Sequence, residues 1–112
     1  MAHRGEIYWL DWSPGRGSEQ TGVRAALIIQ NDMGNRYSPT TIVASVTTAQ
    51  ERPYPFMVPM TARESGLPKN SAVNLSAILT VDQSRLRQKC GELSAERMAE
   101  VDRAVKKSLG IG

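Results

Sequence analysis

The amino-acid sequence predicts a mainly β fold with one C-terminal helix. Short runs rich in β-branched and aromatic residues recur along most of the chain, separated by loops rich in proline and glycine. The final segment, 94–109, instead has apolar residues at helical spacing. Strands this short between such loops are typical of a small, strongly curled barrel. No linker or repeat interrupts the pattern, so residues 1–112 are expected to form a single domain.

Three strands are the clearest elements of the first half. Residues 6–11 are aromatic and aliphatic, and the Pro/Gly-rich segment 13–17 cannot continue them as a strand. Residues 25–30 carry apolar side chains on both faces, as expected of a central strand. In the segment 41–47 alternate residues share a face, so Thr47 is expected to point away from the more apolar of the two faces.

The remaining predicted elements are shorter. Pro59 cannot donate a hydrogen bond to a sheet ladder, so the strand that contains it is expected at a sheet edge. Further strands are predicted at 56–60, 72–75, 77–81 and 89–93. Single helical turns are predicted within the connection 31–39 and at 82–86, and a turn-rich excursion at 61–70.

The segment 94–109 is the one predicted helix of full length. Ser94 is a good N-cap, and Lys106 and Lys107 suit the negative end of the helix dipole. Packing on the sheet is the role that the pattern favours over contact with a substrate. The apolar stripe expected to make this packing consists of Met98, Val101, Val105 and Leu109.

Composition excludes several kinds of site. The single cysteine excludes an internal disulfide, and one cysteine with one histidine does not suffice for a zinc site. No tight cluster of acidic residues suggests magnesium, so neither a metal nor another cofactor is expected. Short apolar runs and the lack of a signal region predict a cytoplasmic protein. The formal net charge of +3 is mildly favourable for a nucleic-acid ligand.

Three side chains have alternative interpretations. His3 is either a catalytic base or part of a mobile N-terminal tail, and the tail is favoured because nothing in the sequence fixes its position. Cys90 is either half of a Cys–His nucleophile pair or a small buried apolar residue, and burial is favoured. Trp12, at a loop edge, is either a platform for unpaired bases or part of the packing, and packing is favoured.

The strongest functional signal lies in the stretch 17–35, a polar loop followed by an apolar strand and a second loop. Arg24 lies where the first loop meets the strand, and its planar guanidinium matches phosphate oxygens. By default such an arginine is a solvated surface residue, and Thr47 at a strand end is an ordinary β-former. With Glu19 as proton acceptor or arginine partner, the set suits metal-free cleavage of RNA, which carries its own 2′-hydroxyl nucleophile.

Short motifs stand in a characteristic order along nearly the whole chain. They are Arg4-Gly5-Glu6-Ile7-Tyr8, Asp11-Trp12-Ser13-Pro14, Gly17-Ser18-Glu19-Gln20, Gly22-Val23-Arg24, Val46-Thr47 and Tyr54-Pro55-Phe56-Met57-Val58-Pro59. In order and spacing this set resembles the MazF/PemK toxins, which are bacterial endoribonucleases of toxin–antitoxin pairs.

The resemblance implies an SH3-like β-barrel of the MazF/PemK/CcdB type that forms a homodimer. It implies a sequence-specific, metal-independent endoribonuclease that cuts single-stranded RNA to 2′,3′-cyclic phosphate and 5′-hydroxyl ends, and that a cognate MazE-like antitoxin neutralises. The family's catalytic arginine and threonine fall on Arg24 and Thr47. The residues matched to RNA binding are Ser18, Glu19, Gln20, Asn31 and Thr48.

The sequence departs from the family pattern at Ala77 and Leu79, where the family has a Gln-x-Arg pair. Because Arg24 and Thr47 are retained, the resemblance implies an active enzyme with an unusual sequence preference. Two alternatives stay open: a non-catalytic toxin that inhibits a protein such as DNA gyrase, and a barrel that binds single-stranded RNA without cutting it. Cleavage of naked RNA in the presence of EDTA separates the first interpretation from both.

Overall fold

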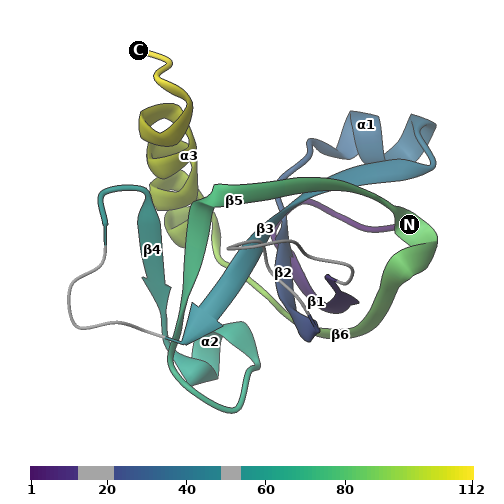
Figure 1. Cartoon of the computed structure of the whole chain (residues 1–112), viewed down its shortest axis with the longest axis horizontal. Coiled ribbons are helices and arrows are strands. Elements are labelled where there is room, and N and C mark those ends of the chain that lie inside the picture. The colour runs from purple at the N-terminus through teal and green to yellow at the C-terminus, as the bar shows by residue number, and fades with distance from the viewer. Residues whose placement is uncertain (13–21, 49–53) are drawn as a thin grey trace.

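The computed structural model describes residues 1–12, 22–48 and 54–112 (Figure 1). Its elements in chain order are β1 (Glu6–Asp11), β2 (Val23–Ile28), α1 (Asp32–Tyr37), β3 (Thr40–Thr48), β4 (Met57–Met60), α2 (Ala62–Ser65), β5 (Ser71–Asp82), the 3₁₀ turn η1 (Gln83–Arg85), β6 (Leu86–Glu92) and α3 (Ala95–Leu109). The predicted strands and C-terminal helix are confirmed. Strand β2 begins earlier than predicted because its pairing with β1 starts at Val23. Within the described ranges, no helix has the length and apolar character needed to cross a membrane.

The strands form an antiparallel sheet in the order β4-β5-β3-β2-β1-β6. Figure 1 shows the long β5 curving so that the chain returns to β1 through β6. The strand that contains Pro59 is at an edge, as predicted. Among the described residues no ladder joins β4 to β6, so the sheet is strongly curled but does not close into a complete barrel.

Strand β5 joins two segments that the sequence presents as separate strands, 72–75 and 77–81. Its ladder with β3 shifts register in the middle, where Asn74 and Ile78 pair with consecutive residues of β3. The Asn74 side-chain oxygen accepts hydrogen bonds from the backbone N–H and the hydroxyl of Ser76 within this irregularity. Because a bulge bends a strand without ending it, the polar interruption does not divide β5.

Apolar residues are buried on both faces of the sheet. One core cluster contains residues of β1 to β5 together with Met98 and Val101 of α3. The other contains Val43 and is covered by the N-terminal segment, the end of β5 and the start of β6. Both faces of β3 are therefore buried in the middle of the strand, where Val43 and Ser45 on the less apolar face are fully buried. The curl of the sheet, which encloses this face, is a long-range property.

Helix α3 begins at the predicted N-cap, where the Ser94 hydroxyl accepts a hydrogen bond from the Arg97 N–H. Met98 and Val101 are buried as predicted, and Ala104 joins them. Leu109 is 58% exposed, so its assignment to the packed stripe is wrong. Figure 1 shows the C-terminal end of α3 projecting beyond the sheet, where the last turn has no sheet to cover.

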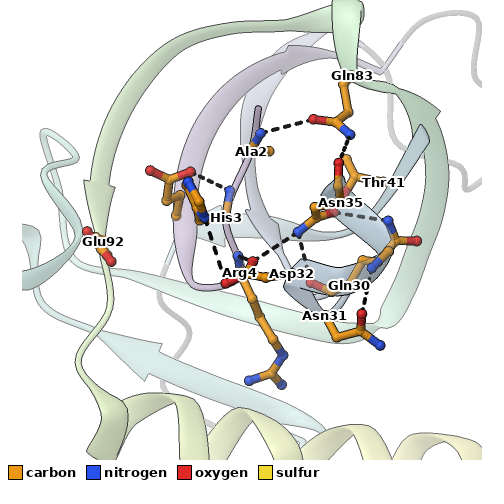
Figure 2. Close-up of polar contacts among 12 residues, drawn as sticks. Ala2, His3, Arg4, Gln30, Asn31, Asp32, Asn35, Thr41, Gln83 and Glu92 are labelled. Atoms are coloured by element: carbon orange, nitrogen blue, oxygen red, sulfur yellow. Dashed lines mark hydrogen bonds and ion pairs between the residues drawn. The ribbon is translucent and has the colours of Figure 1, made fainter. Parts of the chain in front are cut away.

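Polar contacts fix the N-terminus, so the expectation of a mobile tail around His3 is wrong (Figure 2). The Ala2 N–H donates to Oε1 of Gln83 at 2.9 Å, and the Arg4 N–H donates to Oδ1 of Asp32 at 2.6 Å. His3 Nδ1 lies 3.7 Å from Oδ2 of Asp32. All these partners are distant in sequence, which is why the local composition does not reveal them.

Candidate functional site

An open pocket of about 280 Å³ lies where β2 begins, β3 ends and β5 begins. These strands are neighbours in the sheet, and their antiparallel directions bring those three termini to the same end of it. The pocket is lined by Trp9, Val23, Arg24, Ala25, Val46, Thr47, Thr48, Leu67, Pro68, Lys69 and Ser71. It thus brings together three residues that the sequence analysis selected: Arg24, Thr47 and Thr48.

Arg24 and Thr47 lie on adjacent strands, near the start of β2 and near the end of β3. The ladder between these strands ends at the pair Ala26–Ser45, two residues short of Arg24 on β2 and of Thr47 on β3. Both residues line the pocket. The Thr47 hydroxyl donates to the Thr48 carbonyl oxygen at 3.3 Å, a long and exposed contact that a ligand oxygen can replace.

Positive charge and hydroxyl groups dominate the polar part of the described lining. Arg24 and Lys69 are its cations, and the hydroxyls come from Thr47, Thr48 and Ser71. No carboxylate is present among these described lining residues. Guanidinium, ammonium and hydroxyl donors are the groups that bind phosphate oxygens. The pocket is therefore suited to an anionic ligand such as the backbone of a nucleic acid.

Trp9, not Trp12, is the aromatic residue of the pocket. Trp9 is partly buried, packs against the core cluster that includes α3, and lines the pocket. Trp12 is only 6% exposed and belongs to the other core cluster. The packing interpretation of Trp12 is confirmed and the stacking alternative is wrong. Which tryptophan reaches the site depends on which face of β1 the pocket adjoins, and the sequence alone does not determine that face.

The one other predicted site residue that the structure describes, Asn31, does not line this pocket. Asn31 lies beyond the opposite end of β2, where it is the N-cap of α1 and its Oδ1 accepts a hydrogen bond from the Gly34 N–H at 2.7 Å. Ala77 and Leu79 of β5 are also absent from the pocket lining. Ser18, Glu19 and Gln20 lie outside the described residues.

Lys69 and Ser71 line the pocket although the sequence analysis did not identify them. The segment 61–70 has the composition of an ordinary turn-rich connection. It reaches the pocket because Ser71 pairs with Thr48 across the ladder between β5 and β3. No local pattern indicates which strands will be neighbours, so sequence alone offers no signal for these two residues.

The described residues offer neither a metal-binding cluster nor an activated thiol. In the parts of the chain that the structure describes, no group of three or more His, Cys, Asp or Glu side chains is placed to hold a metal ion. Cys90 packs against the core cluster that includes α3, and burial raises the pKa of its thiol. A raised pKa disfavours the thiolate that nucleophilic catalysis needs, which supports the packing interpretation of Cys90.

Known proteins of one family are similar to this chain along its length. A family model described as "PemK-like, MazF-like toxin of type II toxin-antitoxin system" matches residues 3–109. An endoribonuclease MazF of Staphylococcus epidermidis is 46% identical over 112 residues, which cover 99% of this chain and 93% of that protein.

Solved structures show the same fold. A mycobacterial endoribonuclease in complex with its cognate antitoxin has a TM-score of 0.83 at 25% identity, covering 100% of this chain and 98% of that one. MazF from Deinococcus radiodurans has a TM-score of 0.81 at 27% identity, covering 97% of this chain and 96% of that one. Sequence and structure together show that the chain belongs to the PemK-like, MazF-like family of toxins of type II toxin–antitoxin systems.

Proposed function

We propose that this protein is a sequence-specific, metal-independent endoribonuclease that acts on single-stranded RNA in the cytoplasm. The observation that carries the proposal is that Arg24 and Thr47 line one pocket, whose described cations are Arg24 and Lys69. The relative from S. epidermidis is an endoribonuclease, which supports the same activity. In this proposal the protein works as a homodimer and is neutralised by a cognate MazE-like antitoxin. The complex of the mycobacterial relative with its cognate antitoxin supports the antitoxin partner.

In the proposed reaction the RNA supplies its own nucleophile. The 2′-hydroxyl oxygen attacks the adjacent phosphorus, the bond from phosphorus to the 5′ oxygen breaks, and the products carry a 2′,3′-cyclic phosphate and a 5′-hydroxyl. One proton leaves the 2′-hydroxyl and one reaches the departing 5′ oxygen, so the step needs no net reagent. Arg24 binds the non-bridging oxygens as their negative charge grows, and Thr47 donates a hydrogen bond to one of them.

Arginine cannot act as the proton acceptor, because its guanidinium group already carries a proton under all ordinary conditions. Arg24 is therefore assigned to charge stabilisation. The described lining contains no carboxylate or histidine. In our proposal Glu19, from the segment that precedes β2, supplies the carboxylate, either to accept the 2′ proton or to orient Arg24.

The proposal is tested by incubating purified protein with a long natural RNA in EDTA and mapping both new ends. We expect cuts at one short motif with 5′-hydroxyl ends, and at least about a 10³-fold slower reaction for Arg24→Ala. Arg103→Ala, on the exposed side of α3, is the matched control and should cut like the wild type. A folded wild-type protein that makes no cuts would instead favour a toxin that acts on a protein target. Full activity in Arg24→Ala would overturn the role of Arg24.

A further inference from the structure

Hydrogen bonds and a strand pairing on either side of Lys69 hold its segment in place. The side-chain oxygen of Asn70 accepts a hydrogen bond from the Ala62 N–H at 2.9 Å, which closes the excursion from α2 to β5. The Ser71 hydroxyl donates to the Lys69 carbonyl oxygen at 3.0 Å. Ser71 then enters the ladder opposite Thr48. The backbone at Lys69 is thus tied to the strand that ends at Thr47 and Thr48.

The same segment is braced against two further elements. The Glu64 carboxylate of α2 receives two hydrogen bonds from the Arg97 guanidinium of α3, at 2.8 and 3.0 Å. Gly66 has a φ of +76°, and a Cβ added there would lie 2.0 Å from the Cys90 carbonyl oxygen of β6. Only glycine allows this approach. Because these contacts tie the segment 62–71 to both α3 and β6, it forms a fixed wall of the pocket.

The side chain of Lys69 itself is exposed to solvent. In the residues that the structure describes, no carboxylate forms an ion pair with it, whereas Lys89 pairs with Glu6 at 2.7 Å. Lys69 and Arg24 line the same pocket and give it two cationic positions. Arginine matches one phosphate through a planar fork, and lysine acts as a point charge toward another.

We propose that Lys69 binds a backbone phosphate of the RNA that flanks the scissile one, while Arg24 and Thr47 act on the scissile phosphate. This inference rests on the proposed function and deepens it. Lys69 is a binding residue rather than a catalytic one, because its contact is the same before and during cleavage. Its contribution should therefore appear in RNA affinity and in salt dependence, and not in the rate of the chemical step.

The test uses an oligonucleotide containing the cut motif mapped on the natural RNA. Cleavage is measured on the all-RNA form, and binding is measured on a form with 2′-deoxyribose at the cut, which lacks the nucleophile. Lys69→Gln should weaken binding roughly fivefold at low salt and reduce the slope of log affinity against log salt by about 0.7. The rate at saturating RNA should stay within about twofold of the wild type. Lys69→Arg should restore affinity, and Lys107→Gln on α3 serves as the control.

A methylphosphonate scan of the oligonucleotide locates the contact. Each methylphosphonate is neutral, so it removes the charge of one backbone phosphate at a time. Wild-type protein should lose affinity at one position beside the cut, and Lys69→Gln should lose nothing further there. Unchanged affinity and salt slope in Lys69→Gln, with a wild type that cuts normally, would overturn the inference and leave the proposed function intact. A lower rate at saturating RNA with unchanged affinity would overturn it too. A wild type that neither binds nor cuts RNA would remove both proposals.

Discussion

The two ends of the sheet are both polar, but they are built in opposite ways. Where β2 ends and β3 begins, side chains bind one another. Asn35, only 1% exposed, accepts hydrogen bonds from Gln30 and Thr41 and donates to the Gln30 carbonyl oxygen. At the other end, where β2 begins and β3 ends, the described pocket collects cations and hydroxyls without a carboxylate among them. Figure 2 shows the first end, with each labelled amide turned toward a partner.

This difference separates stability from function. A buried polar group that has its partners stabilises one conformation, because each lost partner would leave a desolvated group unpaired. The Thr47 hydroxyl lines an open pocket and makes one long, exposed hydrogen bond, so a ligand can replace that contact at little cost. The network around Asn35 should therefore control folding, and the pocket around Thr47 should control RNA cleavage.

The largest expected effect is on activity at the pocket end. Thr47→Ala removes the hydroxyl assigned to the scissile phosphate, so cleavage at saturating RNA should fall about 10²-fold to 10³-fold. The free energy of unfolding should change by less than about 1 kcal/mol, because the hydroxyl makes only one long, exposed hydrogen bond. Cleavage kinetics and urea unfolding on the same preparation measure both quantities. Wild-type activity in this variant would break the assignment of Thr47.

The opposite result is expected at the network end. Asn35→Ala leaves the Thr41 hydroxyl, which is fully buried, without its acceptor, and it removes a donor to the Gln30 carbonyl oxygen. The free energy of unfolding should fall by about 2 to 3 kcal/mol. Cleavage at a temperature where the variant remains folded should stay near the wild-type rate. A strong loss of activity in a fully folded variant would show that the two ends are coupled.

A smaller, pH-dependent effect is expected at the brace behind the pocket. The Arg97 guanidinium lowers the pKa of the Glu64 carboxyl in the folded protein. A lowered pKa stabilises the fold above the unfolded value, about 4.3, and this contribution is lost as pH falls through the folded value. Glu64→Gln should therefore cost about 1 kcal/mol near pH 7 and much less near pH 3.

Urea unfolding of the wild type and Glu64→Gln at both pH values measures this difference. Equal gaps between the two proteins at pH 7 and pH 3 would contradict the assigned role of the carboxylate. If the brace also positions Lys69, the variant should show weaker RNA binding at neutral pH with little change in the rate at saturating RNA. That outcome would link the wall of the pocket to α3.

Local patterns were sufficient for most of the fold. Alternation and turn residues predicted β1, β2 and β3, and Pro59 predicted an edge strand. The Ser94 cap predicted the start of α3. These features are set by residues close in sequence, and their energetics are local. The errors arose where distant segments decide: the exposure of Leu109 and the contacts of the N-terminus both depend on segments far away in the sequence.

For the site, the sequence by itself determined which two residues are proposed as catalytic, Arg24 and Thr47, because both stand in motifs that resemble one family. Only the tertiary structure decided that they lie at one end of the sheet with Thr48, that Asn31 lies at the other, and that Trp9 rather than Trp12 lines the pocket. Only the pairing of β5 with β3 brought Lys69 to the same place. The physical reason is that strand order and register are set by burial of the whole core, and no short segment contains that information.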